Sequence, residues 1–272
     1  MGLTETTATE TAVTSSPAFT AEDVARFHAN GWWIDTTVSD AARANATRTP
    51  DRAAYLDHPD RSLTWREFDT AATALARQLA GAGVRLGDRI AVWHGDTTAI
   101  HVLWVAIERC GAVVVGVGAR AGIREVTAIL QGAEPRLLVT DPPRRDQAQT
   151  VAAAINCPQL TLDELSVGTE PVTVSPDAQL GPDDVFLINS TSGTTGLPKC
   201  VVHTQNRWYY FHQHAVANGL LTSDDVFLPV IPTPFGFGLW TTHITPIHLG
   251  VTSVLLDRFS VAAACAAIEQ HK

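Results

Sequence analysis

Residues 191–199 of this sequence read Thr191-Ser192-Gly193-Thr194-Thr195-Gly196-Leu197-Pro198-Lys199, and they follow an apolar segment, Asp184–Asn189, that is expected to be a buried strand. Glycines let the backbone turn sharply and present its N–H groups to an anion, and the hydroxyl groups add further donors. Lys199 places a cation at the end of the loop, on an arm that Pro198 stiffens. The pattern predicts a loop that binds a chain of phosphate groups.

Two other interpretations of this loop are weaker. A Walker loop requires G-x-x-x-x-G-K-[ST], but here Leu197 and Pro198 separate Gly196 from Lys199, and Cys200 follows the lysine. A flexible Ser/Gly linker is normally longer and more polar, and it would not lie between two hydrophobic strands.

The composition of the chain makes Lys199 an unusual residue. The chain has 272 residues and is 45% hydrophobic, which is enough for one large domain or two small ones. Its formal net charge of −9 argues against nucleic acid and anionic membranes as partners. The only lysines among its 19 basic residues are Lys199 and Lys272. A site for a polyphosphate must therefore gather positive charge locally.

Other features indicate an ordinary cytoplasmic protein. No apolar run approaches the roughly 20 residues that a membrane-spanning helix needs. Residues 1–20 are polar and Thr-rich and are expected to be a disordered tail rather than a secretion signal. The four cysteines are scattered and are expected to be reduced thiols. Four histidines without metal-ligand spacing are expected to be structural or solvent-exposed: His212, His214, His243 and His248.

Strands and helices alternate along most of the chain, with short connections marked by Gly or Pro. This order predicts an α/β fold with largely parallel sheets covered by helices. The expected strands are Ala53–Leu56, Ser62–Thr64, Arg89–Trp93, Ala112–Gly116, Arg136–Thr140, Asp184–Asn189, Val201–His203, Asp225–Pro229 and Thr252–Leu256. The expected helices are Ala21–Ala29, Ser39–Ala46 with Ser39 as N-cap, Trp65–Ala80 with Thr64 as N-cap, Thr97–Arg109, Ile123–Gly132, Asn206–Ala217 and Val261–His271. Residues 167–183 are expected to be a surface linker.

One segment competes with the phosphate loop as a nucleotide site. Val113–Gly122 contains Gly116-x-Gly118 between a strand and a helix, which is similar to a dinucleotide fingerprint. The third glycine, Gly122, comes one position late, and no acidic residue ends the next strand before Asp141. Dinucleotide binding is therefore the weaker hypothesis.

The loop resembles the [ST]-[ST]-G-[ST]-[ST]-G-x-P-K signature of the adenylate-forming (AMP-dependent synthetase/ligase) superfamily, in its acyl- and aryl-CoA synthetase branch. All nine positions of Thr191–Lys199 fit, although Cys200 stands where the family commonly has Gly. Further stretches also resemble the family: Leu63–Glu67, Gly87–Val92, Gly111–Val115 and Val201–Asn206. The resemblance covers roughly Gly31–Lys272. It implies that Thr191, Ser192, Gly193, Thr194, Thr195, Gly196 and Lys199 bind nucleotide phosphates.

The resemblance also suggests a role for a second segment, Pro232–Leu239. Many relatives have P-L-F-H-x-x-G-L where this chain has Pro232–Leu239, and that region lines the pocket for the carboxylic acid. The resemblance therefore implies an acyl pocket at Phe235, Gly236, Phe237 and Gly238, with Phe235 in place of the usual His. Without the phosphate loop upstream, a Gly/Pro-rich loop with core aromatics would explain this segment equally well.

The resemblance implies ATP, Mg²⁺ and coenzyme A as ligands and a small carboxylic acid as substrate. The family's adenine wall, magnesium-binding carboxylate, ribose-binding aspartate and mobile C-terminal lid domain are expected beyond Lys272. Residues 21–272 are therefore interpreted as a partial N-terminal AMP-binding domain that holds no catalytic residue or metal ligand. We expect little activity from it alone, and a separate C-terminal half or a homodimer is a possible partner. The alternative is a degenerate, non-catalytic module that binds nucleotide or acyl groups.

Overall fold

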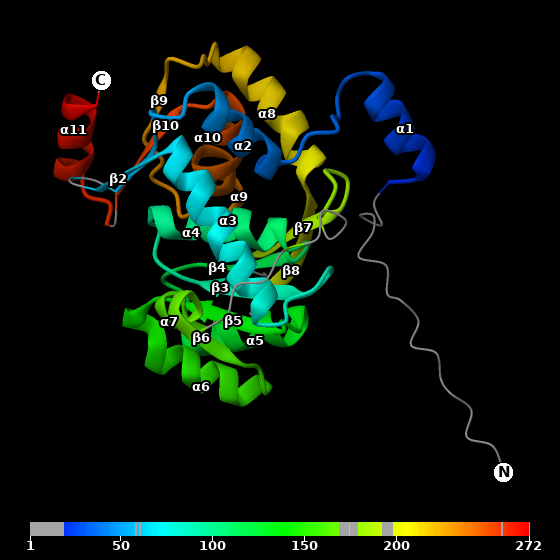
Figure 1. The fold of residues 1–272 in the computed structure, drawn as a ribbon, viewed down its shortest axis with the longest axis vertical. Coiled ribbons are helices and arrows are strands. Elements are labelled where there is room, and N and C mark those ends of the chain that lie inside the picture. Colours follow the sequence, from blue (N-terminus) through cyan, green and yellow to red (C-terminus); the bar gives the residue numbers. More distant parts are fainter. Residues whose placement is uncertain are drawn as a thin grey trace.

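The computed structural model describes residues 19–57, 59, 61–168, 174, 179–191, 198–256 and 258–271. These residues form a six-stranded sheet and a four-stranded sheet (Figure 1). The larger sheet has the order β6-β5-β3-β4-β7-β8 and the smaller one the order β2-β1-β10-β9. The larger sheet consists of β3 (Arg89–Trp93), β4 (Val113–Val117), β5 (Leu137–Thr140), β6 (Gln159–Thr161), β7 (Val185–Thr191) and β8 (Lys199–Thr204). The smaller sheet consists of β1 (Ala53–Asp57), β2 (Arg61–Thr64), β9 (Val226–Phe227) and β10 (Thr252–Leu255).

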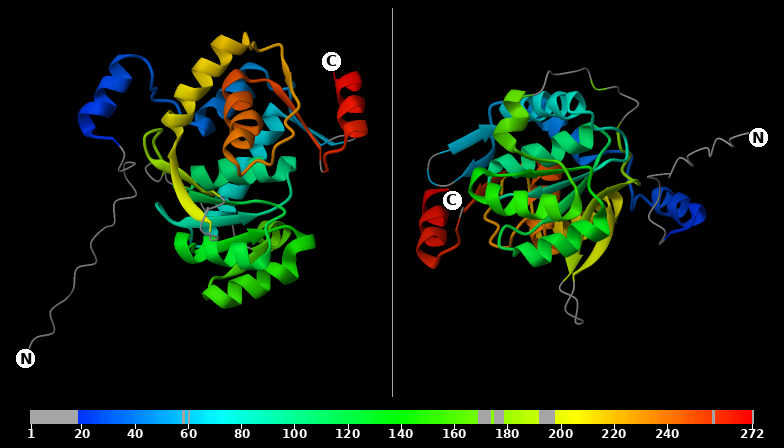
Figure 2. Two further views of the ribbon diagram at one scale, coloured as in Figure 1. Left: turned by 180° about the vertical axis from the view of Figure 1, so that it is seen from behind. Right: turned by 90° about the horizontal axis from the view of Figure 1, so that it is seen from below.

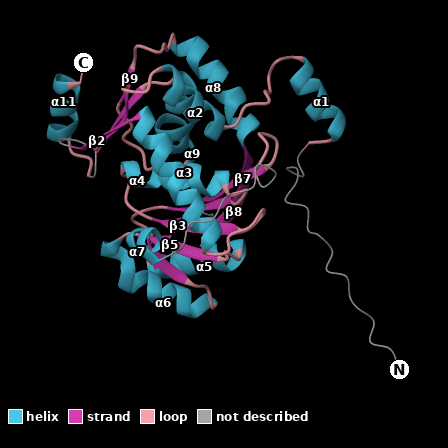
Figure 3. Ribbon diagram, viewed as in Figure 1, coloured by secondary structure: helices cyan, strands magenta, loops and turns pink. Residues whose placement is uncertain are grey.

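The larger sheet is parallel except at one edge. Strands β3 to β7 all pair in parallel, and β8 pairs with β7 in the antiparallel direction. Helices cover both faces (Figure 3): α3 (Trp65–Gly81) and α4 (Thr98–Arg109) on one, α5 (Ile123–Ala133) and α6 (Arg145–Ile155) on the other. The predicted α/β class with helix-covered parallel sheets is confirmed.

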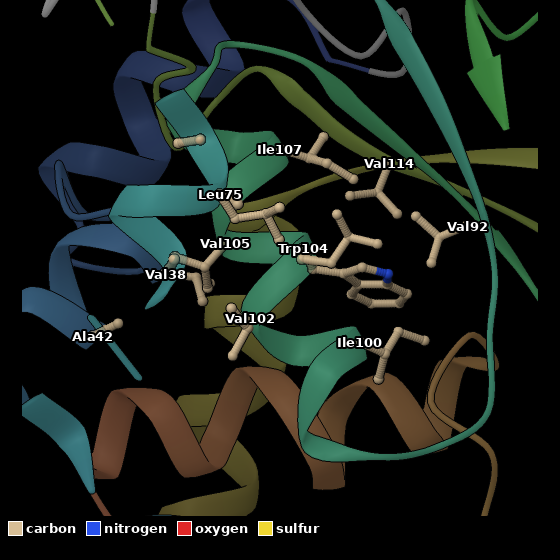
Figure 4. Close-up of a cluster of buried hydrophobic side chains, with 14 of the residues drawn as sticks. Val38, Ala42, Leu75, Val92, Ile100, Val102, Trp104, Val105, Ile107 and Val114 are labelled. Carbon is tan, nitrogen blue, oxygen red and sulfur yellow. The ribbon is translucent and has the colours of Figure 1, made fainter. Parts of the chain in front are cut away.

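Successive side chains along each strand point to opposite faces of the sheet and join two hydrophobic clusters. In β3, Ile90 and Val92 join the cluster beneath α3 and α4, whereas Ala91 and Trp93 join the cluster beneath α5 and α6. Figure 4 shows Trp104 of α4 in the first cluster, between Ile100 and the strand residues Val92 and Val114. Helix α4 is buried on nearly all sides. Each fully buried side chain of this size contributes about 1.5–3 kcal/mol of transfer free energy.

The N-terminal helices begin at capping boxes. The Thr20, Thr37 and Thr64 hydroxyls accept from the N3 backbone N–H of α1 (Ala21–Ala29), α2 (Val38–Arg48) and α3, and the acidic N3 side chain bonds back to each cap. The prediction of Ser39 as an N-cap was wrong. Thr37 takes this role because Asp40 stands three residues after it, and Ser39 is buried instead. Of the predicted tail, 1–18 lie outside the described residues.

The second half of the chain adds short elements that the periodicity did not predict. Helix α8 (Gln205–Gly219) is followed by α9 (Gly236–Leu239), the π-helical turn η3 (Trp240–Ile244), α10 (Thr245–Leu249) and α11 (Val261–Gln270). The turn η1 (Pro142–Arg144) leads into α6, and α7 (Leu162–Gly168) follows β6. Figure 2 shows α1 and α11 at opposite ends of the molecule. Of these elements, only α1, α8 and α11 were predicted.

A proline shapes the π-helical turn. Pro246, in the first turn of α10, has no N–H to donate to the carbonyl group of Thr242 four residues earlier. The Tyr55 hydroxyl of β1 donates to that carbonyl at 2.9 Å instead. The irregular backbone is therefore anchored to the smaller sheet, and its buried acceptor is satisfied.

The predicted linker, 167–183, is only partly described. Helix α7 covers its first residues, and 169–173 and 175–178 lie outside the described residues. Near its other end Leu180 is buried, and Asn206 Nδ2 donates to the Asp183 carboxylate at 2.6 Å. The same carboxylate lies 2.9 Å from His28 Nε2. This end of the segment is therefore attached to α1 and α8 rather than free.

Three further expectations concern membranes, thiols and metals. None of the helices in the described ranges is long and apolar enough to cross a bilayer. All four cysteines are free thiols, as predicted. Within the described ranges, no three His, Cys, Asp or Glu side chains gather where they could hold a metal ion.

Four histidines near the π-helical turn make stability depend on pH. The Nδ1 atoms of His101 and His243 lie 3.1 Å apart. Burial lowers the pKa of His243 and His248 to about 3 and the pKa of His212 to about 4. It also lowers the pKa of His101 well below its usual value. The folded chain therefore excludes protons that the unfolded chain binds below a pKa of about 6.5.

We predict that the free energy of unfolding falls as the pH is lowered from 7.5 to 5. His212, His243 and His248 each remove about 2 kcal/mol over this window, because the unfolded pKa lies inside the window and the folded pKa lies below it. His101 acts in the same direction. Glu108 acts in the opposite direction: burial raises its pKa to about 7, so folding gains a proton there as the pH falls. The stability gained from Glu108 over this window offsets the loss caused by about one of the histidines.

Urea unfolding at the two pH values measures this difference. The variant His243→Gln should reduce the pH dependence by about 2 kcal/mol. The exposed His214 offers a matched control, and His214→Gln should leave the pH dependence unchanged. Equal stability of the unmodified chain at both pH values would contradict the prediction.

Candidate functional site

The predicted phosphate loop is the connection of a β-hairpin. Thr191 ends β7 and pairs with Lys199, which opens β8, and both residues are exposed. Ser192, Gly193, Thr194, Thr195 and Gly196 lie outside the described residues. The structure therefore places the two ends of the loop side by side, and the phosphate contacts remain a prediction.

The hairpin loop lies at the end of the sheet that is formed by the carboxyl ends of the parallel strands, where the other connections also lie. Because β3, β4, β5 and β7 are parallel, the segments that follow them leave the sheet at the same edge. Open parallel sheets bind ligands outside the carboxyl ends of their strands. Three segments thus share an edge with Lys199: 94–97 after β3, 118–122 after β4 and 141–144 after β5.

Two of the four predicted acyl-pocket residues line a cavity close to this edge. Gly236 and Phe237, at the start of α9, border a cavity of about 400 Å³. Its other lining residues come from β8 and α8: His203, Arg207, Trp208 and Phe211. A Cβ atom on Gly236 would lie 3.4 Å from the Trp208 ring, an ordinary contact distance, so the loop lies close to α8. The wall of the cavity is largely aromatic.

The other two predicted residues shape the segment. The Phe235 ring packs onto Gly118, where a Cβ atom would lie 3.2 Å from Phe235 Cζ. Gly238 is buried beneath the Pro232 carbonyl group, and a Cβ atom there would lie 2.0 Å from the carbonyl oxygen. Only glycine fits at position 238 with this backbone.

The same contacts explain the glycines that are similar to a dinucleotide fingerprint. Gly116 lies within β4, and a Cβ atom there would lie 3.2 Å from Pro234 Cβ and 3.4 Å from the Trp104 ring. Gly118 receives the Phe235 ring. Both glycines therefore allow the segment 234–235 to approach the end of β4.

Asn189 of β7 links the predicted phosphate loop to residues 232–239, which are called the acyl segment below. This side chain is buried, and its Nδ2 donates to the Pro234 carbonyl oxygen at 3.2 Å. Its Oδ1 lies 3.0 Å from His203 Nε2 on β8. Burial and the nearby Arg207 guanidinium lower the pKa of His203 to about 4, so the imidazole is neutral near pH 7. Asn189, His203 and Trp208 were not predicted as site residues from the sequence.

A second cleft lies over the loops that follow β3, β4 and β5. It has a volume of about 1270 Å³ and reaches the smaller sheet through Leu255 of β10. Ionisable side chains line it: Arg61, His94, Asp96, Arg120, Asp141, Asp163, Arg144 and Arg258. Arg144 forms an ion pair with Asp141 and also donates to the Ala119 carbonyl group. No ion pair involves Arg61, Arg120 or Arg258 within the described part of the chain.

Asp96 joins this cleft to the acyl segment. The Thr233 backbone N–H donates to Asp96 Oδ1 at 3.0 Å, and burial raises the pKa of this carboxyl group. Two consecutive residues of the segment 232–235 are thus held by hydrogen bonds, Thr233 to Asp96 in the β3 loop and Pro234 to Asn189 of β7.

We predict that Gly238→Ala destabilises the chain by about 3 kcal/mol, because the new methyl group would overlap the Pro232 carbonyl oxygen. Gly236→Ala is the matched control. Its methyl group would meet only the Trp208 ring at an ordinary contact distance, so its cost should stay within about 1 kcal/mol. Thermal or urea unfolding measures both. Similar stabilities of the two variants would show that the loop does not hold this backbone.

The chain resembles known ligases along most of its length. It is 28% identical to the medium-chain fatty-acid–CoA ligase of Escherichia coli, over 93% of this chain and 48% of that protein. It is 30% identical to the salicyl-AMP ligase / salicyl-S-ArCP synthetase of Mycobacterium tuberculosis, with the same two coverages. The apo structure of MbtA from Mycobacterium smegmatis is similar with a TM-score of 0.82 at 28% identity, over 93% of this chain and 50% of that one.

The chain therefore spans about half the length of the curated relatives it matches. A family model described as "AMP-binding enzyme" matches residues 42–272. That range includes both sheets, the hairpin of Thr191 and Lys199, and the acyl segment. Since the match covers most of the sequence and agrees with the fold, this protein belongs to the family of AMP-binding enzymes.

Proposed function

We propose that this chain carries the phosphate-binding and acid-binding part of an AMP-forming acid–thiol ligase. The observation that carries the proposal is the link through Asn189. This residue stands two positions before Thr191 and donates to the Pro234 carbonyl of the segment that borders the aromatic cavity. A nucleotide on the loop and an acid in the cavity would thus be held by directly connected elements. The names of the two ligase relatives support this activity.

The proposed chemistry explains why a cation is needed at Lys199. A carboxylate oxygen attacks the α-phosphorus of ATP, an acyl-adenylate forms, and pyrophosphate leaves. A thiol then attacks the acyl carbon, loses its proton and expels AMP. Negative charge accumulates on the phosphate oxygens in the first step, so positioned N–H groups and a lysine ammonium stabilise its transition state. Lys199 is exposed at the mouth of the hairpin and is available for this role.

ATP and Mg²⁺ are the ligands proposed for the loop. A chain of o-succinylbenzoate coenzyme A synthetase (MenE) from Bacillus subtilis, solved with ATP and magnesium ion, is 25% identical with a TM-score of 0.75. When bound, the metal would neutralise phosphate charge beside Lys199. The described residues offer no group of three metal ligands, and we assign no magnesium ligand to them.

The cleft of about 1270 Å³ is the proposed site for the thiol substrate, coenzyme A. Coenzyme A is a polyanion, and the cleft presents Arg61, Arg120 and Arg258 without carboxylate partners in the described ranges. Asp96 connects this cleft to the acyl segment, so a thiol entering from it would approach the acid. The chain as a whole has a net charge of −9, which makes a local group of arginines the relevant attraction.

The remaining parts of the active site are proposed to come from a partner, either a separate C-terminal half or a second copy of this chain in a homodimer. A degenerate module that binds nucleotide or acyl groups without turnover is the alternative. A cytoplasmic location stays a prediction.

Replacing Lys199 by Ala should weaken ATP binding by about tenfold or more, since a charge-assisted contact to phosphate contributes about 1.5–3 kcal/mol. Isothermal titration calorimetry of the chain with MgATP measures this affinity. Lys199→Arg should retain much of it because the charge is kept. The neighbouring variant Cys200→Ser should bind as the unmodified chain does. Unchanged affinity in Lys199→Ala would remove the loop from the proposal.

ATP–pyrophosphate exchange separates binding from catalysis. We expect the 272-residue chain to show little or no exchange with a panel of fatty and aromatic acids, because active sites of this kind need a lid that closes over the reactants. Robust exchange would contradict this expectation and would also exclude the non-catalytic alternative.

A further inference from the structure

The hydrogen bonds of Asn189 determine which way its amide group points. The Pro234 carbonyl oxygen can only accept a hydrogen bond, so the amide NH₂ must face it, at 3.2 Å. The amide oxygen then faces His203 Nε2 at 3.0 Å. Reversing the amide would place two acceptors against each other in a buried position.

This orientation in turn determines the tautomer of His203. An amide oxygen only accepts, so Nε2 of the imidazole must carry the proton. The neighbouring Arg207 guanidinium and the partial burial of the ring disfavour a second proton. A neutral imidazole with its proton on Nε2 has an unprotonated Nδ1, which is an acceptor. Nδ1 has no hydrogen-bond partner among the described residues.

The cavity that His203 borders is suited to a flat ring. Trp208, Phe211 and Phe237 supply aromatic walls, and the absence of a side chain at Gly236 keeps one wall thin. The His203 ring packs against Trp208 with centroids 5.5 Å apart. Arg207 is a donor and already donates to the Val202 carbonyl group at 3.1 Å. Among the described side chains that line this cavity, His203 alone offers an acceptor nitrogen.

We infer that the cavity selects an aromatic carboxylic acid that carries a hydrogen-bond donor, a phenolic hydroxyl or a ring amine, and that His203 Nδ1 accepts from this group. His203 is thus a specificity-determining residue and Asn189 is its positioning residue. The inference rests on the proposed function in one respect: it takes the cavity to be the acid site of that reaction. The preference itself is a property of binding and can be measured without turnover.

The test compares pairs of acids that differ only in the donor. The 272-residue chain is titrated with 2-, 3- and 4-hydroxybenzoate and with the corresponding methoxybenzoates, followed by ligand-observed NMR near pH 7.5. A methoxy group has the same oxygen but no proton to donate. For at least one ring position, we expect the hydroxy acid to bind about five- to tenfold more tightly than its methoxy partner.

Three variants assign the preference to the cavity. His203→Leu removes the acceptor and should make the paired acids bind equally, with little change for the methoxy acid. His203→Gln retains a donor for Asn189 and an acceptor for the ligand, and it should keep part of the preference. Phe211→Ala removes an exposed aromatic wall and should weaken all the acids alike. Melting curves confirm that each variant is folded, and the comparison on the unmodified chain depends on none of them.

Each outcome bears on the inference separately from the proposed function. Equal affinity for hydroxy and methoxy acids, or a preference that survives in His203→Leu, overturns the role of His203 and leaves the ligase proposal intact. Binding of no aromatic acid, with MgATP binding dependent on Lys199, moves the acid site elsewhere and overturns the inference. A His203-dependent preference without any MgATP binding supports the cavity and counts against the ligase.

Discussion

The antiparallel pairing of β7 with β8 organises the candidate site. Every other strand pair in the larger sheet is parallel, so β8 is the one strand that returns from the carboxyl edge. This reversal sets Lys199 opposite Thr191 and places His203 within hydrogen-bond distance of Asn189. It also starts α8 at Thr204, whose hydroxyl accepts from the Arg207 N–H. The cation, the imidazole and the aromatic wall of the cavity all depend on this single change of strand direction.

Close backbone approach holds the acyl segment in place. Gly116 and Gly118 leave room at the end of β4 for Pro234 and Phe235, and Gly238 leaves room for the Pro232 carbonyl group. Asp96 and Asn189 then hold the backbone of Thr233 and Pro234 through hydrogen bonds. Because these two hydrogen bonds are to backbone atoms, the side chain at position 237 can vary without loss of either bond. Such a design separates the support of a binding site from its specificity.

Buried polar groups connect this site to the stability of the whole chain. His101 of α4 and His243 of the π-helical turn that follows α9 pack against each other. Their neutral forms suit the apolar surroundings, and the cost appears only when acid would protonate them. Ser39, Glu108 and Arg109 form a similar buried network between α2 and α4. Both networks lie between elements that are distant in the sequence.

The sequence by itself determined the α/β class and nearly all strand and helix positions up to β5, because hydrophobic period and capping residues are local signals. Glycine spacing likewise predicts the phosphate loop between β7 and β8. The sequence also marked Phe235–Gly238 through resemblance. Tertiary structure decided what local patterns do not encode: that Thr37 rather than Ser39 caps α2, that Gly116 and Gly118 receive the acyl segment, and that Asn189 and His203 form a pair. An asparagine in one buried strand and a histidine in the next carry no sequence pattern that indicates a contact between them. Only the strand register places Asn189 Oδ1 and His203 Nε2 3.0 Å apart and so fixes the orientation of the imidazole ring.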